Sequence, residues 1–133
     1  MKMQFLNKDH QLKFQELRES MPEHYRNHRR YLTAIFLMTS NEDLEQTMSI
    51  YFDPIRGQFL THEMFKEVSF SKELEVIAKL AVHLYGDSKE INVLALLSYL
   101  DDEYFQLAIN AIEFYRSGVS SQYDSNEEKL YIA

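Results

Sequence analysis

Two strongly periodic helical patterns between residues 71 and 118 constrain the fold of this chain more than any other feature. In the first pattern, apolar residues recur at the spacing that places them on one face of a helix. They are Leu74, Ile77, Ala78, Ala81, Leu84 and Tyr85. Ser71 is placed to cap the start of this helix and Gly86 to cap its end.

The second pattern is apolar on more than one side of the helix. Its members are Tyr104, Phe105, Ala108, Ile109, Ala111, Ile112 and Tyr115. Because one apolar stripe buries only one face, this wider coverage predicts a helix that contacts neighbours on two sides. Asp101 or Asp102 is placed to cap its start, and Gly118 to end it. We expect Leu80 of the first helix and Ile112 of the second to be buried in the core.

Similar signals predict helices in the rest of the chain. Residues that favour a helix start precede further apolar segments at Asn7, Pro22, Asn41, Thr61 and Asn92. In the first of these helices we expect Leu12, Phe14 and Leu17 to face inward. The third is expected to end near Tyr51. The sequence therefore predicts an all-α, single-domain bundle of six or seven helices over residues 1–118.

Residues 53–57 interrupt the helical pattern with the sequence Asp-Pro-Ile-Arg-Gly. Proline disfavours helical geometry in the residue before it, and glycine adopts the unusual backbone angles of a turn. The segments 49–52 and 58–60 are placed to pair across this turn, which predicts a minor β-hairpin near residues 49–60. After the helices, residues 119–133 form an acidic tail that we expect to be flexible.

Composition excludes several classes of protein. The chain has 133 residues, 45% of them hydrophobic, which is typical of one globular domain. It contains no cysteine, so disulfides, thiolate zinc sites and a cysteine nucleophile are excluded. Because the sequence lacks a signal-peptide pattern and any run of eighteen apolar residues, we expect a cytoplasmic protein with no membrane partner.

The net charge of −7 lies in the second half of the chain. Residues 1–60 contain eight acidic and eight basic side chains, whereas residues 61–133 contain thirteen acidic and six basic. An acidic surface repels nucleic acid and favours basic protein partners, although acidity also serves solubility alone. If the acidic side chains converge on one face, they would bind a basic protein surface, and we name Glu67, Glu75 and Glu113 as candidate binding residues.

Four segments resemble a known family when they are taken together. They are RYLTAIFLMTSNEDL at 30–44, IYFD at 50–53, LAVHLYG at 80–86 and LDDEYFQLAINAI at 100–112. Their order and spacing are similar, over residues 5–116, to a family of small uncharacterised helical proteins from Gram-positive bacteria and their phages. The resemblance implies a helical fold and a Gram-positive or mobile-element setting. It implies no catalytic or binding residues.

The segment between residues 24 and 30 is the one basic cluster in an acidic chain. If a helix has begun by Glu23, His24 and His28 would share a face and are weak candidates for a metal site. The arginines Arg26, Arg29 and Arg30 are candidates for binding a phosphate or carboxylate. Two further interpretations are that they pair with Glu16, Glu19 or the acidic half of the fold, or with a second subunit in a homo-oligomer. Direct binding of nucleic acid would need a broader basic surface.

Paired acids and dispersed histidines provide the only enzyme-like features. Asp101-Asp102-Glu103 has the composition of a magnesium or acid–base site, but also that of a helix start. His62 and His83 have no neighbouring nucleophile motif, and His83 is expected to be partly buried. A site assembled from His62, His83 and Asp101 would make the chain a small metal-dependent hydrolase.

We therefore expect a non-enzymatic protein–protein interaction module without a cofactor. The resemblance adds the hypothesis of a phage or mobile-element accessory protein that inhibits a host or defence protein through its acidic surface. The small metal-dependent hydrolase is the alternative.

Overall fold

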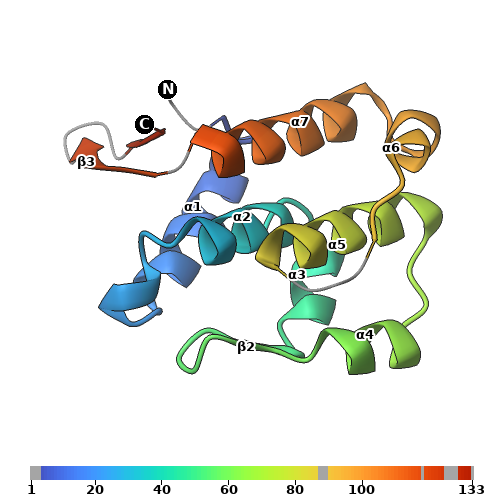
Figure 1. Ribbon diagram of the computed structural model, residues 1–133, viewed down its shortest axis with the longest axis horizontal. Coiled ribbons are helices and arrows are strands. Elements are labelled where there is room, and N and C mark those ends of the chain that lie inside the picture. The colour runs from blue at the N-terminus through green and yellow to red at the C-terminus, as the bar shows by residue number, and fades with distance from the viewer. Residues whose placement is uncertain (1–3, 87–89, 118, 125–128, 133) are drawn as a thin grey trace.

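The computed structural model describes residues 4–86 and 90–117 with their side chains, and the backbone of residues 119–124 and 129–132. Across these residues the chain forms seven α-helices, a short 3-10 helix η1 (Glu23–Tyr25) and two small antiparallel hairpins (Figure 1). The α-helices are α1 (Lys8–Glu19), α2 (Arg29–Met38), α3 (Glu42–Met48), α4 (Thr61–Glu67), α5 (Lys72–Tyr85), α6 (Val93–Tyr99) and α7 (Asp102–Ser117). The predicted all-α bundle with a minor hairpin is confirmed.

Capping hydrogen bonds define most of the helix starts. Side-chain atoms of the predicted caps accept from backbone N–H groups in the first turns of α1, α3, α5, α6 and α7: Asn7, Asn41, Ser71, Asn92 and Asp101. Gly86 ends α5 in the left-handed region, with φ +109°. The helix α4 begins at Thr61 itself, with Leu60 at the N-cap position, and α3 ends at Met48 rather than near Tyr51.

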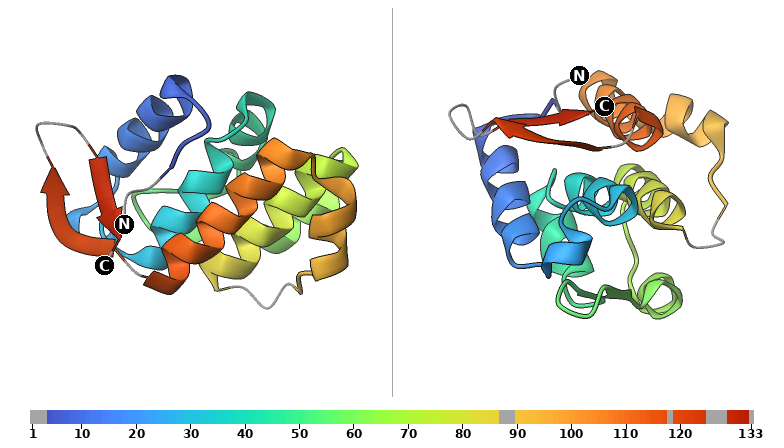
Figure 2. Two further views of the ribbon diagram at one scale, coloured as in Figure 1. Left: turned by 90° about the horizontal axis from the view of Figure 1, so that it is seen from above. Right: turned by 60° about the vertical axis from the view of Figure 1, so that its left-hand side comes forward.

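Helix α2 is the centre of the bundle. Every residue from Leu32 to Met38 is buried, because α2 packs against α1, α5 and α7. Figure 1 and the right-hand view of Figure 2 place α7 on one side of α2 and α5, and α4 with the first hairpin on the other side. In the described part of the chain the strands form only two-stranded hairpins, and the core is centred on α2, which is buried on all sides.

The start of α2 differs from the prediction that Pro22 opens a continuous second helix. Pro22 instead precedes η1, and α2 begins at Arg29. In a continuous helix the carbonyl of Arg26 would accept from the N–H of Arg30. Here that carbonyl accepts from Nε of Arg18 at 2.8 Å, and the N–H of Arg30 donates to Nδ1 of His28. Side-chain hydrogen bonds therefore replace a turn of helix.

Two predicted inward positions are wrong. Leu12 is 44% exposed, because the buried face of α1 consists of His10 and Phe14 with the partly buried Leu17. Ile112 is 37% exposed on α7, whereas Leu80 of α5 is buried as predicted. The imidazole of His10, which is hydrogen-bonded to the carbonyl of Phe36, takes the inward position predicted for Leu12.

Both hairpins are short. Strands β1 (Phe52–Asp53) and β2 (Gln58–Phe59) pair in register Phe52 with Phe59, close to the predicted place. In the tail, which the sequence predicts to be flexible, β3 (Val119–Asp124) pairs with β4 (Lys129–Ile132). This second hairpin was not predicted from the sequence.

Candidate protein-interaction surface

The three arginines of the basic cluster all bind backbone carbonyl groups of the same chain. Nε of Arg30 donates to the carbonyl of Tyr85 at 2.5 Å, and Nη1 of Arg29 donates to the carbonyl of Tyr115 at 3.0 Å. These carbonyls lie at the C-terminal ends of α5 and α7, where a cation complements the helix dipole. Arg26 binds the carbonyls of Met21 and Glu19. The cluster thus joins α2 to two neighbouring helices.

Aromatic rings complete this junction. The guanidinium of Arg30 lies 5.4 Å from the ring centroid of Tyr85, whose hydroxyl donates to the carbonyl of Gly57 at 2.6 Å. Burial raises the pKa of Tyr85 to about 12, so this hydroxyl stays protonated and remains a donor. The hydroxyl of Tyr25 donates to the carbonyl of Arg56 at 3.3 Å. These contacts hold the turn of the first hairpin against η1 and the C-terminal end of α5.

The paired-histidine prediction is wrong in its geometry. His24 lies in η1, with its ring 4.0 Å from that of Tyr25, whereas His28 is the N-cap of α2. The two histidines therefore do not share a helical face. Partial burial, then the charges of Arg30 and Arg29, lowers the pKa of His28. In the described part of the chain, no three His, Asp or Glu side chains come close enough to hold a metal.

The dispersed residues of the hydrolase alternative lie at the ends of different helices. His62 is in the first turn of α4, and His83 is in the last turn of α5, where it is exposed rather than partly buried. The carboxylate of Asp101 accepts from the N–H of Tyr104 at 2.8 Å and so caps α7. The N–H of Asp101 donates to the carboxylate of Glu73. The position of Asp101 is therefore explained by helix capping.

The three candidate acidic residues lie on separate helices. Glu67 of α4 accepts from the hydroxyl of Tyr51 at 3.0 Å, and Glu75 of α5 pairs with Lys79 at 2.8 Å. Glu113 is exposed on α7, and the ribbon views place α7 and α4 on opposite sides of α5. Glu113 thus lies on the far side of α5 from Glu67, whereas Glu75 faces the segment that follows α4.

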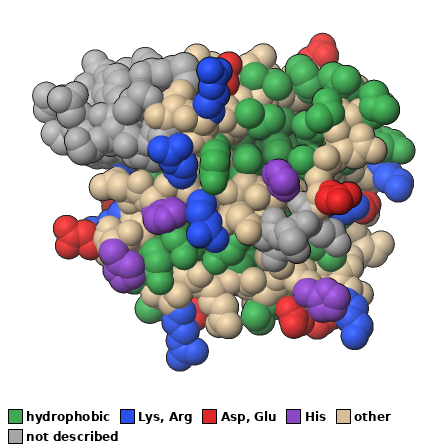
Figure 3. Space-filling model, in the orientation of Figure 1, with side chains coloured by type: hydrophobic (Ala, Val, Ile, Leu, Met, Phe, Trp, Pro, Cys, Tyr) green, Lys and Arg blue, Asp and Glu red, His purple; other side chains and the backbone are tan. Residues whose placement is uncertain are grey.

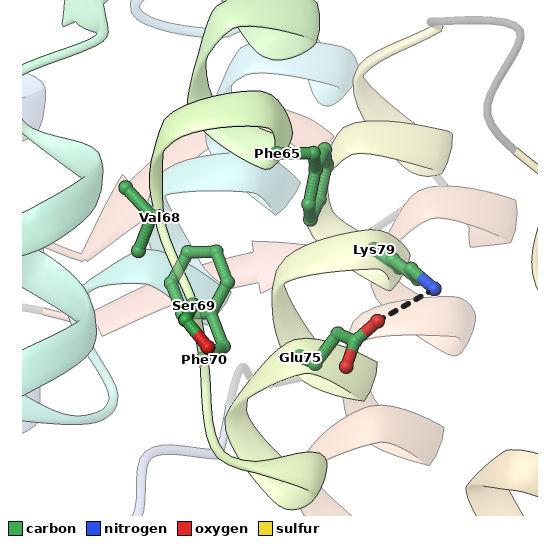
Figure 4. A pocket seen from close by; sticks show the side chains of 6 residues that line it. All are labelled: Phe65, Val68, Ser69, Phe70, Glu75 and Lys79. Carbon is green, nitrogen blue, oxygen red and sulfur yellow. Dashed lines mark ion pairs between the residues drawn. The ribbon is translucent and has the colours of Figure 1, made fainter.

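A hollow of about 320 Å³ lies between α5 and the segment that follows α4 (Figure 4). Phe65, Val68 and Phe70 supply its apolar wall. Glu75 and Lys79 face them from α5 as a closed ion pair (Figure 4). Because its two charged side chains already neutralise each other, this hollow has no uncompensated charge to attract an ion.

An apolar surface on α6 and α7 is the feature best suited to binding. Val93, Leu94 and Leu97 are 64%, 69% and 58% exposed. At about 100° per residue these positions span about 100° of one face of α6, while Leu96 is buried on the other face. Sequence reasoning missed this surface, although apolar residues on both sides of so short a helix were a usable signal.

The same surface continues onto α7. Ile112 is exposed, and Phe105 and Ile109, at i−7 and i−3 from it, are half-buried. Figure 3 shows hydrophobic side chains gathered over α6 and the adjoining part of α7. We call these six residues the α6–α7 surface: Val93, Leu94, Leu97, Phe105, Ile109 and Ile112.

Comparison of the chain with protein-family models, curated proteins and solved structures found no match. The resemblance to small helical proteins of Gram-positive bacteria and phages therefore stays a prediction. Among the described helices, none has both the length and the apolar character needed to cross a membrane.

Proposed function

We propose that this protein is a non-enzymatic protein–protein interaction module and that it binds its partner through the α6–α7 surface. The observation that carries the proposal is the exposure of Val93, Leu94 and Leu97 on one face of α6. Contiguous exposed apolar surface on a small protein is typical of a binding site. Fully burying one Val or Leu side chain contributes about 1.5–3 kcal/mol, so this face can offset part of the cost of association.

The second apolar stripe of α7 supports the same proposal. The sequence predicts that α7 contacts neighbours on two sides, and within the described chain only one of these sides is fully covered. Leu107, Ala108, Ala111 and Phe114 are buried, whereas Ile112 is exposed. A partner on the α6–α7 surface would supply the second neighbour. A role as an accessory protein of a phage or mobile element rests on the sequence resemblance alone.

Site-specific crosslinking tests this function. A photoreactive amino acid in place of Leu97 is expected to give a crosslinked partner in a lysate of Gram-positive cells. The double change Leu94→Asp and Leu97→Asp, in affinity capture, should remove the same protein. Ile50 and Ile55 are 76% and 68% exposed near the first hairpin, so Ile50→Asp with Ile55→Asp is the matched control. If both double variants capture the partner equally, the α6–α7 surface is not its binding site.

A further inference from the structure

The α6–α7 surface lies within a segment that has negative charge only. Residues 90–115 contain five acidic side chains and no lysine, arginine or histidine. All five are exposed: Glu90, Asp101, Asp102, Glu103 and Glu113. Glu90 precedes α6, but it lines a hollow on the α5 side of that helix together with Lys72 and Lys79. The next three residues lie where α6 passes into α7, and Glu113 follows Ile112. The apolar face is therefore bordered by carboxylates between and along its two helices.

We infer that the partner of the α6–α7 surface is a basic amphipathic α-helix, whose apolar stripe covers this surface and whose lysines and arginines meet the bordering carboxylates. This inference rests on the proposed function and gives the chemistry of the partner. Complementary charge at the rim of an apolar contact sets partner choice and association rate. An anionic lipid surface or nucleic acid would meet repulsion from the same bordering carboxylates.

The shape of the surface favours a helix over an extended peptide. Adding a strand requires a sheet edge with free backbone groups, whereas this surface is built from two helices whose backbone groups are paired internally. Val93 and Leu97, and likewise Phe105 and Ile109, are four residues apart and form ridges. Such ridges fit the grooves of another helix. A second copy of this chain would bring the same carboxylates together, which is unfavourable.

Two lysines of α5, Lys72 and Lys79, lie in the hollow of about 130 Å³ that Glu90 also lines, away from the exposed face of α6. Lys72 of α5 lies over the ring of Tyr99 at 5.8 Å, on the α5 side of α6. Lys79 of α5 is paired with Glu75. Arg116 is exposed in the last turn of α7, four residues after Ile112, so a basic side chain lies at that end of the surface. Asp101, Asp102, Glu103 and Glu113 still give the border of the surface an excess of negative charge.

Three synthetic peptides test the inference. Each has about 18 residues, enough for five helical turns, with leucines on one stripe and lysine, glutamine or glutamate at all flanking positions. Fluorescence anisotropy of the labelled peptides with the full-length protein is expected to show binding of the lysine peptide at least about tenfold tighter than the glutamate peptide. Raising the salt concentration from about 50 to about 300 mM should weaken the binding of the lysine peptide severalfold.

Matched variants separate local charge from net charge. The triple variant Asp102→Asn, Glu103→Gln, Glu113→Gln should weaken binding of the lysine peptide by about tenfold, which corresponds to about 1.4 kcal/mol. The control Glu19→Gln, Glu23→Gln, Glu63→Gln makes the same change in net charge, from −7 to −4 by removing three negative charges, on α1, η1 and α4. The affinity of this control variant for the lysine peptide should stay within about twofold of the affinity of the unmodified protein. Asp101 is left unchanged because it caps α7.

Each outcome decides between the two proposals. Equal binding of the three peptides, no binding of the lysine peptide, or equal weakening by both triple variants would overturn the basic helix. Self-association of the chain through this surface would also overturn it. Analytical sedimentation would detect that self-association, and Leu94→Asp would abolish it. If the crosslinked partner still depends on Leu94 and Leu97 in those cases, the proposed function stands without the inference. Thermal unfolding of every variant, monitored by circular dichroism, checks that the fold is retained.

Discussion

At the scale of single residues, the buried imidazole of His10 fastens the N-terminal segment to the centre of the bundle. One ring nitrogen, Nδ1, accepts from the N–H of Leu6 at 3.1 Å, so the proton must be on the other. Nε2–H then donates to the carbonyl of Phe36, 2.7 Å away. The ring also packs against Phe5 and Phe36, with centroid distances of 5.0 Å. The neutral ring therefore satisfies both hydrogen bonds within an apolar cluster.

This arrangement predicts acid sensitivity that a variant should remove. Burial lowers the pKa of His10 to about 4, against hydrogen bonding to Phe36 and the charge of Asp9, which raise it. Between this value and the unfolded pKa of about 6.5, the unfolded chain binds more protons, so stability falls as the pH falls. From about pH 7 to about pH 4 the loss is about 3 kcal/mol. Urea unfolding of the unmodified protein and of His10→Gln should reveal it.

The comparison isolates His10 from the carboxylates, which also titrate in this range. The free energy of unfolding of His10→Gln is expected to fall less with pH, so that its difference from the unmodified protein changes by about 3 kcal/mol. Parallel pH profiles for the two proteins would show that the ring is protonated in the folded state or that it stays accessible to water.

The role of a single residue could be predicted from the sequence when its hydrogen-bond partner is close along the chain, but not when the partner is far away. The caps Asn7, Asn41 and Asn92 bind N–H groups two or three residues away, so their roles could be predicted from adjacent sequence. His10 depends on a carbonyl 26 residues away, which the local pattern does not specify. The exchange of Leu12 for His10 on the inner face of α1 follows from that long-range bond.

At the scale of helices, the ends of α5 and α7 are held by arginines from the start of α2. The left-handed Gly86 leaves room for this contact, since a Cβ there would lie 2.7 Å from Nε of Arg30. Periodicity predicts that α2, α5 and α7 exist, but not that two adjacent arginines cap the other two helices. The basic cluster was therefore predicted to meet carboxylates, whereas it meets helix carbonyls.

Removing the Arg30 cap should destabilise the fold by more than its partial exposure suggests. Arg30→Met keeps most of the apolar stem but loses the charged hydrogen bond to Tyr85, which predicts a cost of about 1.5–3 kcal/mol in urea unfolding. Arg56 is the matched control, because its side chain is 79% exposed and lies 3.8 Å from Asp53. Arg56→Met should change the free energy of unfolding by less than about 0.5 kcal/mol. If Arg30→Met and Arg56→Met lower the free energy of unfolding equally, the charged contact of Arg30 with the C-terminal end of α5 does not stabilise the fold.

At the scale of the whole molecule, the helical pattern determines the fold more completely than it determines the binding surface. A helix with apolar residues on two sides is readable from sequence, as α7 is. The second side of α7 can contact either another helix of the chain or a partner, and the position of α6 determines which. Because α6 has only seven residues, its apolar pattern does not predict that position. The acidic half was predicted to act through Glu67, Glu75 and Glu113, yet these residues lie on separate helices.

Two truncations distinguish the covered side of the bundle from the uncovered one. Leu80 is 2% exposed, so Leu80→Ala should cost about 2–5 kcal/mol in the free energy of unfolding. Ile112 is 37% exposed, and alanine favours helix more than isoleucine does, so Ile112→Ala should cost less than about 1 kcal/mol.

Binding is expected to reverse this order. Because Ile112 belongs to the α6–α7 surface, Ile112→Ala should weaken capture of the crosslinked partner, whereas Leu80→Ala should leave the affinity of the folded fraction unchanged. Urea unfolding at several protein concentrations provides the check. If Ile112→Ala costs as much stability as Leu80→Ala, something already covers this side of α7, and a concentration-dependent midpoint would identify a second copy of the chain as that cover.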